Sequence, residues 1–359
     1  MTAVPAGDQG SSLLHAARTL AAELLEPQAA QVDATVVPRS HLDALGKAGL
    51  LGLMAPESDG GAAATPALQR QIQRILAGAD AATWFVSVQH HGPVRALSDS
   101  TAAIRAQLLP QLVSGETVAG TAFAQLRRWP DRPMRAERVD GGWRFSGVAP
   151  WYTGWGLNDV CSLGGATADG EVVFGLVEAR TQPGLVASEP MRMAAMTATR
   201  TVRLDLDDLL VPDSHVVLRQ PVEEWLRVDR RQTVNPNPAV FGVTEAALRH
   251  LRDVSDRSDL VPGVAAVRRL ADRLAETSAA ADRLVDSVDP DEAHDERLSV
   301  RAAAQRLMMD ATTALVVAGG GRSLAASDPA GRHLREAAFL LVQAQTRPAR
   351  EAMLAHWAT

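Results

Sequence analysis

The sequence predicts an α+β protein with an N-terminal helical domain (residues 1–116), a central antiparallel β-sheet domain (117–217) and a C-terminal four-helix bundle (218–359). Two changes of apolar spacing predict this order. Apolar residues recur at helical spacing in the first third, at every second position through the middle third, and at helical spacing again past Pro221. The chain has 359 residues and is 46% hydrophobic, which is enough to bury substantial cores.

The first third is expected to be helical because residues 13–51 carry apolar side chains three and four positions apart. Ser40 precedes HLDALGKAGLLGLM and is expected to cap that helix, which ends at the glycines after Ser58. Further helices are predicted over Pro66–Gly78, Ala81–Val88 and Ala102–Leu112.

Four segments of the middle third have strand periodicity, and DGG and DG turns lie among them: VAGTAFAQL, WRFSGV, VVFGLVEA and TVRLDLDDLLVP. They predict an antiparallel sheet. The last third predicts long helices of lengths that suit an antiparallel bundle, over Val240–Ser255, Gly263–Val288, His294–Val317 and Pro329–Ala355.

Composition excludes several classes of function. The net charge of -6 and pI near 5.9 provide no basic surface for nucleic acid. A single cysteine, Cys161, excludes an intramolecular disulfide and a multi-cysteine metal site, and we predict no metal. The chain starts without a leader pattern and has no apolar run long enough for a membrane span, so we expect a cytoplasmic protein.

Four passages of the chain follow one another in a family-specific order: HLDALGKAGLLGLMAPESDGG, DGGWRFSGVAPWYTGWGLNDV, TVRLDLDDLLVPDSHVV and VVAGGGRSLAASDPAGRHLREAAFLLVQAQT. Together they resemble the acyl-CoA dehydrogenase family, which includes flavin-dependent monooxygenases of the same fold. The resemblance covers nearly the whole chain. It implies FAD as the cofactor, a small-molecule substrate such as an acyl-CoA, and a homotetramer built as a dimer of dimers.

The resemblance also implies residues that hold the flavin. Trp151 and Thr153 match positions that lie against the flavin ring, and Thr346 matches a threonine that touches it. Gly319 and Gly320 match glycines that approach the adenosine side across a subunit contact. The alternatives are core packing for Trp151 and a plain helix-ending loop for the two glycines.

Two other groups of residues could touch a ligand. His90 and His91 follow a helix that, in the family, borders the substrate cavity, although a histidine near a helix C-terminus is also favoured by the helix dipole. Arg127, Arg128 and Arg132 could meet a CoA or flavin phosphate, or could belong to a solvated turn.

The departures from the family concern the proton acceptor. Dehydrogenation of an acyl thioester requires a carboxylate to remove the α-proton. By the family spacing that glutamate falls at Ala344, beside Gln343, and the alternative family position falls near Gln232. No Asp or Glu lies between Ala337 and Arg350, so the catalytic residue stays unknown.

Two binding motifs also depart from the family pattern. The arginine that meets the flavin pyrophosphate of a neighbouring subunit has no clean counterpart in RDVSDRSDLVPG, where Arg252 or Arg257 could substitute. The usual Thr-Glu-Pro and Gly-Ser-Asp turn is replaced by the shorter, basic FAQLRRWPDRP.

Three functions therefore stay open at this stage. The first is an FAD-dependent oxidoreductase that oxidises an acyl thioester at the α and β carbons. The second is a flavin-dependent monooxygenase that uses reduced flavin and oxygen. The third is a base-lacking partner subunit of a heteromeric acyl-CoA dehydrogenase.

Overall fold

The N-terminal third is helical, as predicted. The computed structural model describes residues 6–355 and 358, so the outer ends of the first and third predicted domains lie outside the described residues. The helices are α1 (Ala6–Leu20), the π-helix η1 (Ala21–Leu25), α2 (Glu26–Ala34), α3 (Arg39–Lys47), α4 (Pro66–Ala79), α5 (Ala81–Ser98) and α6 (Arg105–Ser114). The predicted cap at Ser40 is wrong, because α3 begins at Arg39 behind Pro38 and Ser40 lies inside its first turn.

The middle third forms one eight-stranded, mostly antiparallel sheet. Its strands are β1 (Ala119–Ala122), β2 (Met134–Val139), β3 (Gly142–Tyr152), β4 (Val160–Ala166), β5 (Glu171–Glu178), β6 (Leu185–Ala187), β7 (Val202–Pro212) and β8 (Val216–Pro221). The order is β6-β7-β3-β2-β4-β5-β8, with β1 added on β4. The pairs β1–β4 and β2–β4 are parallel, which departs from a purely antiparallel sheet.

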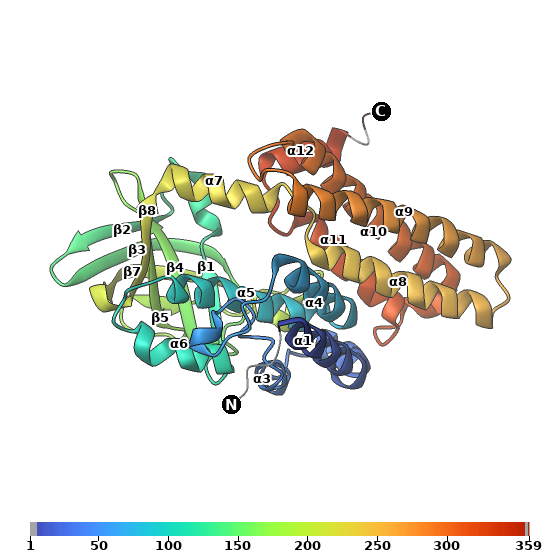
Figure 1. Ribbon diagram of the computed structural model, residues 1–359, viewed down its shortest axis with the longest axis horizontal. Coiled ribbons are helices and arrows are strands. Elements are labelled where there is room, and N and C mark those ends of the chain that lie inside the picture. The colour runs from blue at the N-terminus through green and yellow to red at the C-terminus, as the bar shows by residue number, and fades with distance from the viewer. Residues whose placement is uncertain (1–5, 356–357, 359) are drawn as a thin grey trace.

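The last third is a helical bundle, and the three-part α+β architecture is confirmed. Its helices are α7 (Val222–Thr233), α8 (Pro238–Arg257), α9 (Val261–Ser287), α10 (His294–Gly319), α11 (Pro329–Val342) and α12 (Arg347–Ala355). Figure 1 shows the sheet at one end of the molecule and α8–α12 at the other, with α7 running from β8 to the bundle. The division at residues 116/117 and 217/218 stays a prediction. Within the described residues, no helix is both long and apolar enough to cross a membrane.

One predicted helix is wrong in extent. We expected a single helix over Pro329–Ala355, but α11 ends at Val342 and α12 starts at Arg347. The break is set by tertiary contacts, since Ala344 has a left-handed φ of 49° and the backbone carbonyls of Gln343 and Ala344 accept hydrogen bonds from Arg301.

The N-terminal helices and the bundle share one hydrophobic core. Ile72 and Leu76 of α4 belong to the same buried cluster as Phe241 of α8. The helices α4 and α8 approach so closely that a Cβ atom at Gly242 would lie 2.1 Å from the carbonyl oxygen of Arg74. The sheet has a separate core that contains Phe145, Leu163 and Val211.

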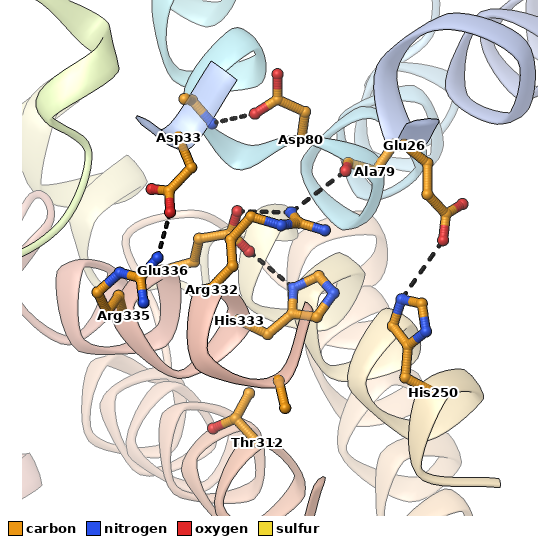
Figure 2. A network of polar contacts seen from close by, with 12 residues as sticks. Glu26, Asp33, Ala79, Asp80, His250, Thr312, Arg332, His333, Arg335 and Glu336 are labelled. Carbon is orange, nitrogen blue, oxygen red and sulfur yellow. Dashed lines mark hydrogen bonds and ion pairs between the residues drawn. The ribbon is translucent and has the colours of Figure 1, made fainter. Parts of the chain in front are cut away.

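A buried polar network fixes α11 against the N-terminal helices (Figure 2). The Glu336 carboxylate accepts from Arg332 Nη1 at 2.9 Å and from His333 Nδ1 at 2.7 Å. Arg332 also donates to the carbonyl of Ala79, where α4 ends, and Arg335 pairs with Asp33 of α2. Although burial acts to raise it, Arg332 and His333 lower the pKa of Glu336 to about 2.

We predict that Glu336→Ala lowers the free energy of unfolding by about 3–5 kcal/mol, because it leaves a buried guanidinium without its counter-charge. Denaturant unfolding at neutral pH measures this change. Glu351→Ala is the matched control, since Glu351 pairs with Arg347 at the same helical spacing on the surface and its loss should change nothing measurable. Equal effects of the two substitutions would contradict this account of the network.

Candidate functional site

The end of β3 presents an aromatic ring to solvent beside a row of buried hydroxyls. The Trp151 side chain is 54% exposed, whereas Tyr152 is fully buried in the sheet core. Thr153 is buried, and its Oγ1 lies 3.2 Å from Oγ1 of Thr201, which is 3.0 Å from Oγ1 of Thr199. The two predicted flavin contacts therefore differ. The Trp151 indole is largely exposed to solvent, whereas the Thr153 hydroxyl already has a hydrogen-bond partner.

The loop between α11 and α12 contains the position where the family glutamate is expected. Gln343 accepts a hydrogen bond from Asn237 Nδ2 through its Oε1 atom at 2.8 Å. Ala344 and Thr346 are half-buried, and Thr346 Oγ1 accepts from the Ala349 amide at 3.4 Å, near the start of α12.

The junction of α7 and α8 contains the alternative position for a base. Gln232 is exposed on the last turn of α7, and the carbonyl of Thr233 accepts from Arg301 Nη1. Because Arg301 also donates to Gln343 and Ala344 through Nη2, one guanidinium joins the two segments in which the resemblance predicts an acid. The structure thus brings the neighbourhoods of Gln232 and Ala344 together.

The carboxylates that flank these segments have cationic partners. Glu336 is the last acidic residue before the loop, and it is bound to Arg332 and His333. Asp229 of α7 forms two hydrogen bonds of 2.8 Å with Arg127. Neither carboxylate is a free proton acceptor.

His90 is used structurally through both ring nitrogens. Its Nε2 donates to the Leu112 carbonyl at 3.0 Å, and its Nδ1 accepts from the Ala119 amide at 2.9 Å. Burial, followed by the neighbouring His91, lowers the pKa of His90 to about 3. Burial lowers the pKa of His91 to about 4, but Nδ1 of His91 has no hydrogen-bond partner among the described residues. Of these two histidines, only His91 has a ring nitrogen without a partner among the described residues. That His91 lies beside a substrate stays a prediction.

We predict that the stability of the protein falls as pH falls below about 6.5, because His90 is neutral when folded and takes up a proton on unfolding. His90→Gln keeps one donor and one acceptor but does not titrate. It should reduce the slope of unfolding free energy against pH by up to about 1.4 kcal/mol per pH unit. Denaturant unfolding between pH 5 and pH 7 measures the slope. His15→Gln, at an exposed position, is the control, and an unchanged slope in His90→Gln would contradict the prediction.

The residues predicted to act across a subunit contact lie at the far end of the bundle. The helix α11, which has 14 residues and spans about 21 Å, separates Gly320 from the 343–346 loop. Arg252 and Arg257 are at the end of α8, which runs in the same direction as α10 (Figure 1). A Cβ atom at Gly319 would meet Ser323 Oγ at 2.2 Å, whereas Gly320, with φ of 60°, has nothing within 4 Å. One chain therefore does not bring these residues to Trp151 and Thr346.

Two arginines of the basic cluster after β1 already have carboxylate partners. Arg127 is paired with Asp229 and lies 5.4 Å from the centre of the Phe123 ring. Arg128 pairs with Asp131 at 3.5 Å on the surface, and Arg132 is half-buried. A phosphate contact by this cluster stays a prediction.

Sequence reasoning missed Arg301 and Asn237. Arginine is so common in this chain that no single one stood out. A signal was present, since Arg297, Arg301 and Gln305 recur every four residues along α10 and all three are buried. Charged residues at core spacing on a helix indicate a buried polar contact.

Comparison with known proteins identifies both a domain and a fold. Residues 8–116 match the model of the acyl-CoA dehydrogenase N-terminal domain family. The fold is similar to butyryl-CoA dehydrogenase from Megasphaera elsdenii (TM-score 0.82, 16% identity, 100% of both chains). It is also similar to glutaryl-CoA dehydrogenase in complex with glutaryl-CoA (TM-score 0.81, 16% identity, 100% of this chain and 96% of that one). A third similar structure is FkbI, for biosynthesis of the methoxymalonyl extender unit of a polyketide immunosuppressant (TM-score 0.79, 16% identity, 95% and 99% covered). No curated protein sequence matches this chain.

Proposed function

We propose that this chain, which belongs to the acyl-CoA dehydrogenase superfamily by its N-terminal domain and its fold, binds FAD and oxidises an acyl thioester between the α and β carbons. One observation supports the proposal most: Arg301 donates hydrogen bonds to both the α7–α8 junction and the α11–α12 loop, and so holds them together. These are the two segments at which the resemblance expects the reacting part of a thioester.

The residues at the end of β3 and in the α11–α12 loop suit a flavin. The exposed indole of Trp151 offers an aromatic wall, and the hydroxyls of Thr153 and Thr346 lie on segments expected at the ring. The bound flavin supplies the hydride acceptor, while the protein orients and encloses it. Gly319 and Gly320 of a second copy would reach the adenosine half, so we propose a homo-oligomer and, from the resemblance, a homotetramer.

We predict that the purified full-length chain takes up FAD and that an acyl-CoA thioester bleaches the bound flavin under anaerobic conditions. Trp151→Ala should weaken FAD binding about tenfold or more, because the ring loses its aromatic wall, and Trp151→Phe should largely retain it. Absorbance titration measures both. A chain that takes up no FAD, or a bound flavin that no thioester bleaches, would contradict the proposal.

The chain has no carboxylate for the proton-transfer step at either family position. The sequence from Ala337 to Arg350 lacks Asp and Glu, and Glu336 is held by Arg332 and His333. We therefore propose that water or a group on the substrate accepts the α-proton, which makes flavin reduction slow.

Ala344→Glu tests this assignment directly. The half-buried Ala344 already has a left-handed backbone, so a glutamate there adds a carboxylate without a further change of φ. We predict that it speeds flavin reduction by butyryl-CoA about 100-fold or more, as expected for a positioned general base. Stopped-flow absorbance measures the rate, and Ala344→Gln is the uncharged control. If Ala344→Glu binds FAD but is no faster than Ala344→Gln, the position of the base is misassigned.

The missing acid favours one second candidate, a flavin-dependent monooxygenase of the same fold, because that chemistry does not need a carboxylate to remove an α-proton. Oxygen consumption by the FAD-loaded chain in the presence of a flavin reductase, without bleaching by thioesters, would favour it. A partner-subunit role would instead require that the chain alone takes up no FAD and binds a related subunit. Native mass measurement distinguishes a homotetramer from such a heteromer.

A further inference from the structure

Two arginines of α10 are buried without a carboxylate. Arg297 and Arg301 are one turn apart and are 1% and 4% exposed. Within the described residues, all the hydrogen bonds of both guanidinium groups go to backbone carbonyls or to a side-chain amide. A buried charge is costly unless it is compensated, so each arginine requires an explanation.

Arg297 is explained by its contacts alone. Its Nε donates to the carbonyl of Glu292, its Nη1 to Oδ1 of Asn235, and its Nη2 to the carbonyls of Val288 and Asp289. Every nitrogen of this guanidinium has an acceptor, and the contacts tie the α9–α10 connection to the α7–α8 junction. Arg297 is a structural clamp.

Arg301 differs from Arg297 in two respects. Its Nη1 and Nη2 donate to four backbone carbonyls, but its buried Nε has no hydrogen-bond partner among the described residues. A second cation, Arg127, is also close enough to repel it; burial and then this repulsion lower the pKa of Arg301 to about 10. Arg127 forms an ion pair with Asp229, whereas Arg301 has no carboxylate partner among the described residues.

The uncompensated charge lies where the resemblance predicts an acid. Arg301 contacts Thr233, Gln343 and Ala344, which belong to the two segments where a base was expected. The nearby Arg127 forms an ion pair with Asp229, so the net positive charge of this region is that of Arg301. A base-free and positively charged site favours an anionic group on the molecule that enters it.

We propose that Arg301 binds a carboxylate carried by the acyl part of the thioester, so that the substrate class is a dicarboxylic acyl thioester and not a simple fatty acyl thioester. The inference rests on the proposed function. The carboxylate accepts from Arg301 Nε and supplies the counter-charge that the chain lacks. Arg297 takes no part.

The test compares thioesters that differ in one charge. Binding of succinyl-CoA against butyryl-CoA, and of glutaryl-CoA against pentanoyl-CoA, is measured by titration calorimetry on the FAD-loaded full-length chain. We expect a preference of about tenfold or more for the carboxylated member of at least one pair. Arg301→Gln should reduce this preference to within about twofold, and the ratio of the two affinities within each pair is the readout, because the loss of the loop contacts acts on both thioesters. Arg297→Gln, the matched control, should keep the preference even if it lowers stability.

The possible outcomes separate this inference from the proposed function. Absence of a preference in the wild-type chain, or a preference that survives Arg301→Gln, overturns the inference alone. Binding of neither member of either pair overturns the proposed function and the inference with it. If Arg301→Gln does not fold, Arg301→Lys takes its place, because it keeps a buried positive charge but removes Nε, the atom assigned to the carboxylate. A preference unchanged in Arg301→Lys then overturns the inference.

Discussion

A buried carboxylate held by an arginine and a histidine, at the place where the N-terminal helices meet the bundle, sets the position of α11. Glu336 binds Arg332 and His333 with the short, well-directed contacts that a desolvated ion pair needs to offset its own burial. Arg332 extends this anchor to the carbonyl at the end of α4. The loop that follows α11 depends on this anchor, because the place where α11 ends determines where residues 343–346 begin. The position of residues 343–346 in the candidate site therefore depends on this buried polar network.

The same network also engages the acidic residue that precedes the loop. Glu336, the one acidic residue of α11, lies in the middle of the helix and holds it in place, so it does not serve as a proton acceptor. The loop itself is held by Arg301, whose charge has no carboxylate within the described part of the chain. At the position where the resemblance predicts an acid, the loop therefore contacts a guanidinium. The chemistry at this position thus depends on what the ligand carries as well as on the cofactor.

The sequence predicted the architecture well, because periodicity reports which face of an element is buried. It failed where a tertiary contact overrides local pattern. Residues 343–346 are Gln, Ala, Gln and Thr and contain neither glycine nor proline, so the sequence does not reveal that Arg301 and Asn237 hold a break in the helix there. The strand β4 has no alternation because six of its seven residues are buried, and α7 was missed because it is mostly polar. Trp151, Thr153 and Thr346 were identified by resemblance and not by periodicity, and their roles stay proposals.

Amide hydrogen–deuterium exchange of the full-length chain, with and without FAD, tests the central claim most directly. The account predicts slower exchange on FAD binding in three separate segments: residues 151–153, 232–237 and 343–346. These segments come from the sheet, the α7–α8 junction and the α11–α12 loop, and a flavin that contacts all three, as proposed, is the reason to expect them to respond together. If FAD binds but these three segments exchange at unchanged rates while others are protected, the site has been placed in the wrong part of the molecule.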